Sequence, residues 1–424
     1  MTVGARRMRG AGALALAIAV SVLVPRAASG VVNPGSTTST TIAPGLVFTQ
    51  IVDTSGPNRI YVLDIDLTTP LSMETTRAGF KMGAYAKTSD MAKAVGAIAA
   101  VDGDYSIWPG RPQHAFADDG SLLDTSLAIG SSFQVRTDET TAVIQHESTH
   151  VTLRNDQTAA TFAASAWNTG GPPPNAIVVS SPYGGSVEPP PANSCSARLK
   201  APASPTWGAG ELGVTRTYTV GLRKCRTKPL AAKPGTIVLS ARRGGKGAAW
   251  IVALRPKDKV DVSWDAGVPD VVNVMGGAPM LVSDGAVVAM DCKSYFCGRN
   301  PRTAVGITAD GHVLLVVVDG RSRSSVGMTI VGFAKEMQAL GAVWALNLDG
   351  GGSATMWIAG RGVVNTPSDG SGERPVTNAL VVMPGPPTGQ VVPKGVAVPH
   401  AQARAAATLA AGDPGSTGGE TPAG

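Results

Sequence analysis

The chain is poor in the residue types from which zinc sites and Ser-His-Asp centres are built. Its 424 residues include only four cysteines and five histidines. Neither cysteine pair has C-x-x-C spacing, and no histidine lies close to either pair, which argues against a zinc site. Ser353 stands in Gly-Ser-Ala, which is no nucleophile elbow, and no histidine stands near an acid at the end of an expected strand. We therefore do not expect Ser-His-Asp catalysis.

Long apolar stretches are also scarce. The run Ala11–Val24 follows Arg6, Arg7 and Arg9 and precedes small residues at 27–30. This is the layout of a secretory signal peptide; the run is short for a membrane span, and an uncleaved anchor is the alternative. No later stretch is long and apolar enough to cross a bilayer, and no apolar terminal segment suggests a lipid-type anchor. We expect a secreted protein of the extracellular space or the cell envelope.

Aromatic residues make up only 5% of the chain, and no block of Lys and Arg has aromatics interleaved. We therefore expect no nucleic-acid partner. The formal net charge of +6 and the pI of about 9.2 favour anionic partners such as envelope polymers. In an oxidising compartment the cysteines pair most simply as two local disulfides, Cys195–Cys225 and Cys292–Cys297.

Composition and pattern divide the chain into four parts. We predict a signal peptide at 1–30, a linker rich in Ser, Thr and Pro at 31–44, one domain at 45–384 and a disordered tail at 385–424. Within the domain, Pro-rich loops at about 165–230 indicate a peripheral insertion. The 52 glycines and 31 prolines indicate many turns between short strands. We expect an α+β fold, a mixed α/β domain with extended, largely antiparallel β-structure and few helices.

Two segments repeat one design of helix, glycine, apolar strand and acidic turn. The first has a helix at 91–95 before Gly96 and a strand at 97–101, and the second a helix from about 329 to 340 before Gly341. A duplicated unit would bring Asp104 and Asp349 to related positions around one cleft. Chance similarity of short α/β units is the alternative. Further strands are predicted at 45–52, 58–67, 236–240, 250–254 and 313–318.

The stretch Trp344–Trp357 is the strongest candidate for a functional site. The apolar run before Asn347 has no polar face, which predicts a strand covered on both sides. Asn347 and Asp349 then share one face of the extended chain. The glycines at 350–352 let a ligand approach the main chain closely. A tight turn capped by Asp and Asn side chains is the structural alternative.

Acids and arginines gather at the ends of the expected strands. The strand-end acids are Asp104, Asp319 and Asp349. They can act as acid and base or nucleophile in glycoside cleavage, or bind a divalent cation such as calcium or magnesium. The arginines beside Gly- and Pro-rich turns are Arg302, Arg321 and Arg374. Each can grip a phosphate or pair with a nearby acid.

Several motifs occur in one order along the C-terminal half: Asn300–Gly306, Val318–Arg321, Gly327–Thr329, Asn347–Met356 and Val364–Gly370 followed by Gly372–Leu380. In this order they resemble the phosphodiester glycosidase family, which includes N-acetylglucosamine-1-phosphodiester alpha-N-acetylglucosaminidase and exopolysaccharide-associated bacterial members. The resemblance is strongest at about 271–382 and extends from about 45. It implies an α/β fold with extended β-structure and removal of a sugar from a sugar-1-phosphodiester.

The resemblance also implies roles for individual residues. The implied catalytic residues are Asp349, Asp319 and Asp104. The implied substrate-binding residues are Arg302, Arg321, Asn347, Ser353, Thr355, Asn365, Glu373 and Arg374. The chain departs from the family at Asp102, where Asn is usual, at Ser106, where a second aromatic is usual, and at Asn300, where His is frequent.

Three functions compete at this point. The first is a secreted hydrolase of a sugar-1-phosphodiester or related envelope glycan, with no certain cofactor. The second is a non-catalytic module that binds or assembles anionic exopolysaccharide. The third is a structural domain whose acids hold calcium or magnesium. A cleft that joins Asp104, Asp319, Asp349 and Arg302 favours the hydrolase.

Overall fold

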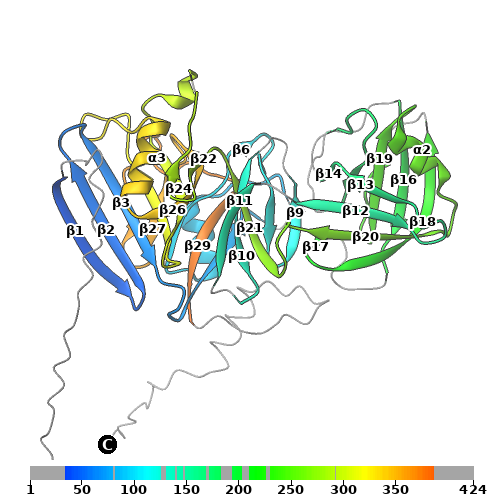
Figure 1. Cartoon of the computed structure of the whole chain (residues 1–424), viewed down its shortest axis with the longest axis horizontal. Helices are drawn as coiled ribbons and strands as arrows, with labels where there is room; N and C mark the ends of the chain where they lie inside the picture. The colour runs from blue at the N-terminus through cyan, green and yellow to red at the C-terminus, as the bar shows by residue number, and fades with distance from the viewer. Residues whose placement is uncertain are drawn as a thin grey trace, which may run out of the picture. The chain divides into compact units, whose positions relative to one another are not determined.

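The computed structural model describes residues 34–79, 82–125, 130–138, 141–146, 149–168, 171–182, 193–202, 210–225, 230–291 and 293–385. These residues form four β-sheets, a two-stranded ribbon and three α-helices (Figure 1). The segment interpreted as a signal peptide, and the tail beyond Gly385, lie outside the described residues. Within the described ranges, no helix is long and apolar enough to cross a membrane.

An eight-stranded antiparallel sheet, which we call the site sheet, carries most of the motifs. In spatial order its strands are β1 (Pro34–Ala43), β2 (Leu46–Asp53), β3 (Asn58–Ile65), β25 (Val313–Val318), β24 (Arg302–Thr308), β26 (Ala342–Gly350), β22 (Met280–Ser283) and β23 (Ala286–Val287). Odd-numbered residues of β25 enter one hydrophobic core and even-numbered residues a second core under helix α3 (Ile330–Ala339). This alternation buries both faces of the sheet.

Strand β26 is covered on both sides, as its composition predicts. Leu346 and Leu348 belong to the first core, whereas Ala345 belongs to the core under α3. Strands β22 and β24 flank β26 and pair with it in antiparallel register. Strand β26 is therefore fixed by a core on each face and a strand at each edge, and it holds the acidic, glycine-rich turn that follows it.

Two smaller sheets share the first core with the site sheet. The five-stranded sheet consists of β28 (Gly362–Val363), β27 (Met356–Ile358), β5 (Ala99–Asp102), β29 (Asn378–Pro384) and β4 (Leu71–Arg77). The six-stranded sheet consists of β11 (Ala142–His146), β10 (Ser131–Arg136), β21 (Val271–Gly277), β8 (Phe116–Asp118), β9 (Ser121–Asp124) and β17 (Gly210–Glu211). The ribbon pairs β6 (Ser106–Ile107) with β7 (Arg111–Pro112).

The region predicted as a peripheral insertion, at about 165–230, contributes strands to the fourth sheet, which we call the lateral sheet. In order, its strands are β13 (Thr161–Ala164), β12 (His150–Asn155), β20 (Lys259–Asp265), β18 (Thr215–Cys225), β16 (Ser194–Lys200), β19 (Thr236–Arg242), β15 (Val178–Ser180) and β14 (Ala166–Trp167). It has a core of its own, in which Trp167, Tyr218 and Trp264 are fully buried. The predicted Cys195–Cys225 disulfide joins β16 to β18. Cys297 is disulfide-bonded, and its predicted partner Cys292 lies outside the described residues.

Two local predictions are wrong. The segment at 31–44 is not a linker over its described part, because β1 pairs along its length with β2. The strand predicted at 250–254 overlaps helix α2 (Lys246–Ala253). Ala248, Ile251 and Leu254 recur every three residues and enter the core of the lateral sheet, which favours a helix over a strand.

Both repeated helix–strand units are present. Helix α1 (Thr88–Val95) begins three residues earlier than predicted, because the Glu373 carboxylate accepts hydrogen bonds from the amide and hydroxyl of Ser89 in its first turn. Gly96 ends α1 at φ +74°. The two strands that follow the helices lie in different sheets, β5 in the five-stranded sheet and β26 in the site sheet.

The fold is richer in β-structure than the α+β prediction implies. Its sheets are mostly antiparallel, with β14–β15 as a short parallel pair, and only 9% of the structure is helical. The prediction of extended antiparallel β-structure with few helices is confirmed, whereas the α+β label fits only loosely.

Candidate active site

A cavity of about 200 Å³ opens beside the glycine-rich turn that follows β26. Its walls are Tyr105, Tyr295, Phe296, Asn300, Arg302, Arg321, Asn347, Leu348, Asp349, Gly350 and Gly351. The glycines are required by close packing: a Cβ atom at Gly350 would lie 2.8 Å from the Pro301 carbonyl oxygen, and one at Gly351, which has φ +62°, would lie 2.9 Å from an Arg321 nitrogen. The turn therefore leaves room for the side chains that line the cavity.

Asp349 is the carboxylate among these lining residues. Its backbone amide donates to the Gly103 carbonyl at 2.9 Å, and its Oδ1 accepts from the Gly350 amide at 2.7 Å. Burial raises the pKa of Asp349 to about 6, against the opposing effect of hydrogen bonds from Ser353 and Gly350. A carboxyl group with this pKa changes its charge close to neutral pH, which suits a general acid or base.

Arg302 presents a cation that no described carboxylate neutralises. Its Nε donates to the Met328 carbonyl at 3.1 Å, and one Nη donates to the carbonyls of Phe296 at 2.5 Å and Gly298 at 2.8 Å. The guanidinium carbon also lies 5.0 Å from the centre of the Phe296 ring. Burial lowers the Arg302 pKa to about 10, and the charge of Arg321 acts in the same direction.

Arg321 supplies a second cation to the same wall. Its backbone has φ +61°, and its guanidinium donates to the Asn300 side chain at 3.1 Å and to the Ser368 hydroxyl at 3.3 Å. In the part of the chain that the structure describes, Arg321 forms no ion pair. Two neighbouring guanidiniums without carboxylate partners favour a bound anion between them.

Neutral polar groups complete the cavity. The Asn347 side-chain amide donates to the carbonyls of Ala278 at 3.0 Å and Leu348 at 2.6 Å and contacts the Tyr105 hydroxyl. This fixes the amide so that Asn347 Oδ1 is buried without a described hydrogen-bond partner. Burial, together with the nearby charges of Asp349 and Asp104, raises the Tyr105 pKa well above its usual value. Tyr105 therefore remains a hydrogen-bond donor.

Asp104 lies beneath the cavity and does not line it. Its Oδ1 lies 2.7 Å from His114 Nδ1, and its Oδ2 accepts from the His114 amide at 2.5 Å. Both side chains are buried. The expectation that no histidine stands near a strand-end acid is therefore wrong. No spacing signal in the sequence joins the two residues, because β6 and β7 separate them and fold back on each other.

Asp319 also lies away from the cavity lining. Its Oδ2 accepts from the Tyr61 hydroxyl at 3.0 Å, and its Oδ1 accepts from the Thr366 amide at 2.9 Å and the Asn365 side chain at 3.2 Å. Burial raises the Asp319 pKa. Asn365 in turn accepts from the Met356 amide at 2.8 Å. These bonds tie β25 to the segment after β28.

The other predicted substrate-binding residues lie around the turn. Glu373 binds the start of α1, and Arg374 grips Asp369 at 2.6 and 2.8 Å close to Gly352. Ser353 is buried and hydrogen-bonds the Asp349 carboxylate. Thr355 is fully buried. The structure thus brings Asp349, Asn347, Arg302 and Arg321 to one cavity.

Asp102, where the sequence departs from the resembled family, lies under the same turn. Its Oδ1 accepts from the Thr303 hydroxyl at 2.8 Å and the Thr355 amide at 2.9 Å. Its Oδ2 is buried and has no partner among the described residues. Complete burial, and then the charge of Asp349, raise the Asp102 pKa well above its usual value. Both effects favour the protonated, neutral form of the Asp102 carboxyl group.

The cavity does not provide the ligands that calcium or magnesium requires. Among the described residues, no group of three or more His, Cys, Asp or Glu side chains could hold a metal ion. One carboxylate and two guanidiniums line the cavity, and the guanidiniums would repel a metal cation. Asp104 and Asp319 use their oxygens within the protein. The donor set therefore does not fit a hard divalent cation.

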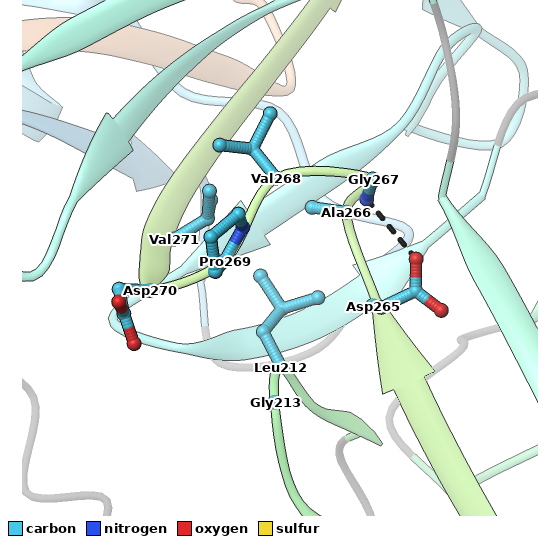
Figure 2. Close-up of a pocket in the computed structure, with 9 residues that line it drawn as sticks. All are labelled: Leu212, Gly213, Asp265, Ala266, Gly267, Val268, Pro269, Asp270 and Val271. Atoms are coloured by element: carbon cyan, nitrogen blue, oxygen red, sulfur yellow. Dashed lines mark hydrogen bonds between the residues drawn. The ribbon is translucent and has the colours of Figure 1, made fainter.

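A second cavity, of about 210 Å³, lies where β20 leads into β21. Figure 2 shows its walls, which are Leu212, Gly213 and residues 265–271. The Asp265 carboxylate accepts from the Gly267 amide at 3.0 Å, and Asp270 lies 3.8 Å from Arg136. The remaining side chains drawn are aliphatic or proline. No arginine lines this cavity, so it offers no comparable site for a phosphate group.

Comparisons with known proteins agree with the site sheet's motifs. Residues 221–383 match the family model described as phosphodiester glycosidase. The SPbeta prophage-derived uncharacterized protein YomE of Bacillus subtilis is 37% identical over 84 residues, which are 20% of this chain and 13% of that protein. The alignment therefore spans a small part of that relative.

Two solved structures share the fold. A hypothetical protein from Synechocystis superposes with a TM-score of 0.67 and 18% identity, over 82% of this chain and 64% of that chain. A candidate exported protein from Burkholderia pseudomallei K96243 gives a TM-score of 0.58 and 24% identity, over 78% of this chain and 75% of that chain. At these identities the two likenesses show the fold alone.

Proposed function

Because residues 221–383 match the phosphodiester glycosidase family model, we propose that this protein hydrolyses the bond between a sugar and phosphate in a sugar-1-phosphodiester. The observation that carries the proposal is one cavity that holds a carboxylate with a pKa of about 6 and two arginines without carboxylate partners. We further propose that it acts outside the cytoplasm, on an envelope glycan. The Cys195–Cys225 disulfide supports this location, because oxidising compartments favour such bonds.

The two arginines bind the phosphodiester. Arg302 retains an Nη that makes no hydrogen bond to a described residue, and Arg321 presents its guanidinium from the facing turn. A guanidinium pair neutralises the phosphate and orients its bridging oxygen. The buried Asn347 Oδ1 accepts a sugar hydroxyl, which satisfies an oxygen that otherwise has no partner.

Asp349 activates water in this mechanism. The phosphate that leaves is a monoester whose second pKa is about 6, so two guanidiniums can stabilise it without a protonated acid. One carboxylate therefore suffices where most glycosidases use two. The Asp349 carboxylate takes a proton from water as the water oxygen bonds to the sugar carbon and the carbon–oxygen bond to phosphate breaks. The products are the free sugar and a phosphate monoester.

The test is release of free sugar from a panel of sugar-1-phosphodiesters. We expect Asp349→Asn to lower kcat about 10²- to 10⁴-fold, the usual contribution of a positioned base, with an unchanged melting temperature. Asp270→Asn in the second cavity is the matched control and should retain full activity. If no member of the panel is hydrolysed while an anionic exopolysaccharide is retained tightly, the chain is a binding module and the hydrolase proposal is wrong.

A further inference from the structure

Positive charge is concentrated in one part of the sequence. Residues 194–259, which run from the start of β16 to the start of β20, contain 14 Lys and Arg but only two Asp and Glu. All other residues together contain 22 Lys and Arg and 28 Asp and Glu. This segment, which contributes β16, β18 and β19 to the lateral sheet, is therefore strongly cationic, whereas the other residues together carry a net negative charge.

Cross-strand register places three of these lysines on one face of the lateral sheet. Lys200 of β16 pairs with Thr219 of β18, which pairs with Lys259 of β20. Directly paired residues share a face, and the Lys259 ammonium indeed donates to the Thr219 hydroxyl at 2.7 Å. Twice the strand spacing puts the backbones of Lys200 and Lys259 about 10 Å apart.

Lys224 extends the same face along the strands. It pairs with Ser196, which lies four residues before Lys200 on β16, so the side chains of Ser196 and Lys200 point to the same side. Four residues of extended chain span about 13 Å. We call the surface of Lys200, Lys224 and Lys259, with the exposed hydroxyl-bearing residues Thr215 and Thr217, the lysine face.

These lysines are exposed and have no ionic partners. Within the described residues, Lys200, Lys224 and Lys259 form no ion pair. The nearest acid on the same face of β20, Asp261, is held by Arg154 at 3.4 Å and by the Thr217 hydroxyl at 2.6 Å. Three uncompensated ammoniums on a rigid sheet would gain most from a ligand with regularly repeated negative charges.

We propose that the lysine face binds a linear, phosphate-bearing glycan polymer; this rests on the proposed function, because it makes the polymer the natural substrate of the chain. Ammonium groups hold phosphates as point charges, and the threonine hydroxyls accept or donate to sugar hydroxyls. The face holds no exposed aromatic residue among those described, and the exposed large apolar residues near it are Leu222 and Val252. Single-stranded nucleic acids need aromatic surfaces on which bases stack, so a glycan polymer fits better.

The binding test uses the full chain carrying Asp349→Asn, so that turnover does not consume the ligand. A fluorescently labelled glycan polymer whose repeating units are joined through sugar-1-phosphodiester bonds is titrated at physiological salt. We expect the triple variant Lys200→Ala, Lys224→Ala and Lys259→Ala to bind about 10- to 100-fold more weakly, from the usual contribution of basic residues near an anionic surface. The matched control removes the same charge at exposed Lys87, Lys93 and Lys335 and should change the affinity less than about twofold.

Three outcomes overturn the inference: equal weakening in both triple variants, no weakening in either, or tighter lysine-dependent binding of single-stranded nucleic acid of equal charge. The catalytic test is separate. With Asp349 restored, the lysine-face variant should keep its kcat/KM on a small sugar-1-phosphodiester and lose about tenfold or more on the polymer. If small substrates are not cleaved but polymer binding depends on the three lysines, the proposed function fails and the binding surface stands.

Discussion

Asp349 and Asp104 follow equivalent helix–glycine–strand steps, yet their surroundings differ. Asp349 ends a strand of the site sheet and faces a cavity with two arginines. Asp104 follows a strand of the five-stranded sheet and has both oxygens engaged by His114. The two turns touch, since the Asp349 amide donates to the Gly103 carbonyl at 2.9 Å. The two similar helix–glycine–strand units thus meet at one place. We infer that the side chains packed against each carboxylate determine whether it is free to react.

The different surroundings of these acids are the reason why the proposed mechanism uses Asp349 alone. Asp102 and Asp104 lie under the turn that carries Asp349, and burial raises the pKa of Asp102. The charge of Asp104 contributes to the raised pKa of Asp349, after burial. The first repeat therefore supports and tunes the acid of the second. Four measurements test whether Asp349 is the reactive acid and Asp102 and Asp104 are supporting groups.

The largest effect should come from removing the buried partner of His114. Asp104→Asn turns one carboxylate oxygen into an N–H group that faces a backbone donor, either the His114 amide at Oδ2 or the Tyr105 amide at Oδ1. We expect the free energy of unfolding to fall by about 1–3 kcal/mol, the cost of leaving buried polar groups unsatisfied. Urea denaturation measures it. The kcat of the folded fraction should change far less than for Asp349→Asn, and an equally large loss of kcat would make Asp104 part of the catalytic machinery.

The next effect concerns phosphate binding. Arg302→Lys keeps the charge but removes the planar fork, so we expect KM for a sugar-1-phosphodiester to rise about tenfold with a smaller change in kcat. Steady-state kinetics measure both parameters. Arg374→Lys is the matched control, because Arg374 already uses its guanidinium to bind Asp369. Equal KM increases in the two variants would show that the cavity does not hold the phosphate through Arg302.

The pH profile tests which protonation state of Asp349 is active. A base must be ionised, so kcat/KM should rise with pH through a midpoint near 6, the raised pKa of Asp349. An acid would give the opposite slope, with activity lost as pH rises through the same value. The phosphodiester stays ionised over this pH range, so its own titration does not alter the slope of the pH–rate profile. Initial rates between about pH 4.5 and 8, at substrate concentrations well below KM, decide between the two signs.

The part of the candidate site that lies on one contiguous stretch of chain can be predicted from the sequence. The run of β26, the glycines after it and the side chains of Asn347 and Asp349 are contiguous, and their covered strand is confirmed. Arg302 and Arg321 can also be predicted as site residues, because their turns carry recognisable motifs. The end of α1 at Gly96 and the Cys195–Cys225 disulfide can likewise be predicted from short sequence patterns.

The features that the sequence does not predict share a physical cause: they depend on contacts between residues that are distant along the chain. The Ser/Thr-rich segment of β1 has no apolar alternation, and it is ordered by the edge of β2. The lateral sheet is assembled from strands of 2 to 11 residues that are distant in sequence, so periodicity within a window cannot reveal how they pair. His114 meets Asp104 only because β6 and β7 fold the chain back between them. Contacts of this kind depend on the register of distant strands rather than on local residue types.

The smallest effect should come from Asp102. Burial favours the neutral form of Asp102, and Asp102→Asn replaces that form by a neutral group of the same shape that preserves the oxygen accepting from Thr303 and Thr355. We expect the free energy of unfolding to change by less than about 1 kcal/mol and the kcat/KM midpoint to stay near 6. Asp102→Ala is the contrasting variant, because it leaves those two donors unsatisfied and should cost about 1–3 kcal/mol. A fall of one pH unit or more in the midpoint of Asp102→Asn would mean that Asp102 carries a charge beside Asp349. The first repeat would then contribute a second ionised carboxylate to the site, and Asp349 would not be the sole reactive acid.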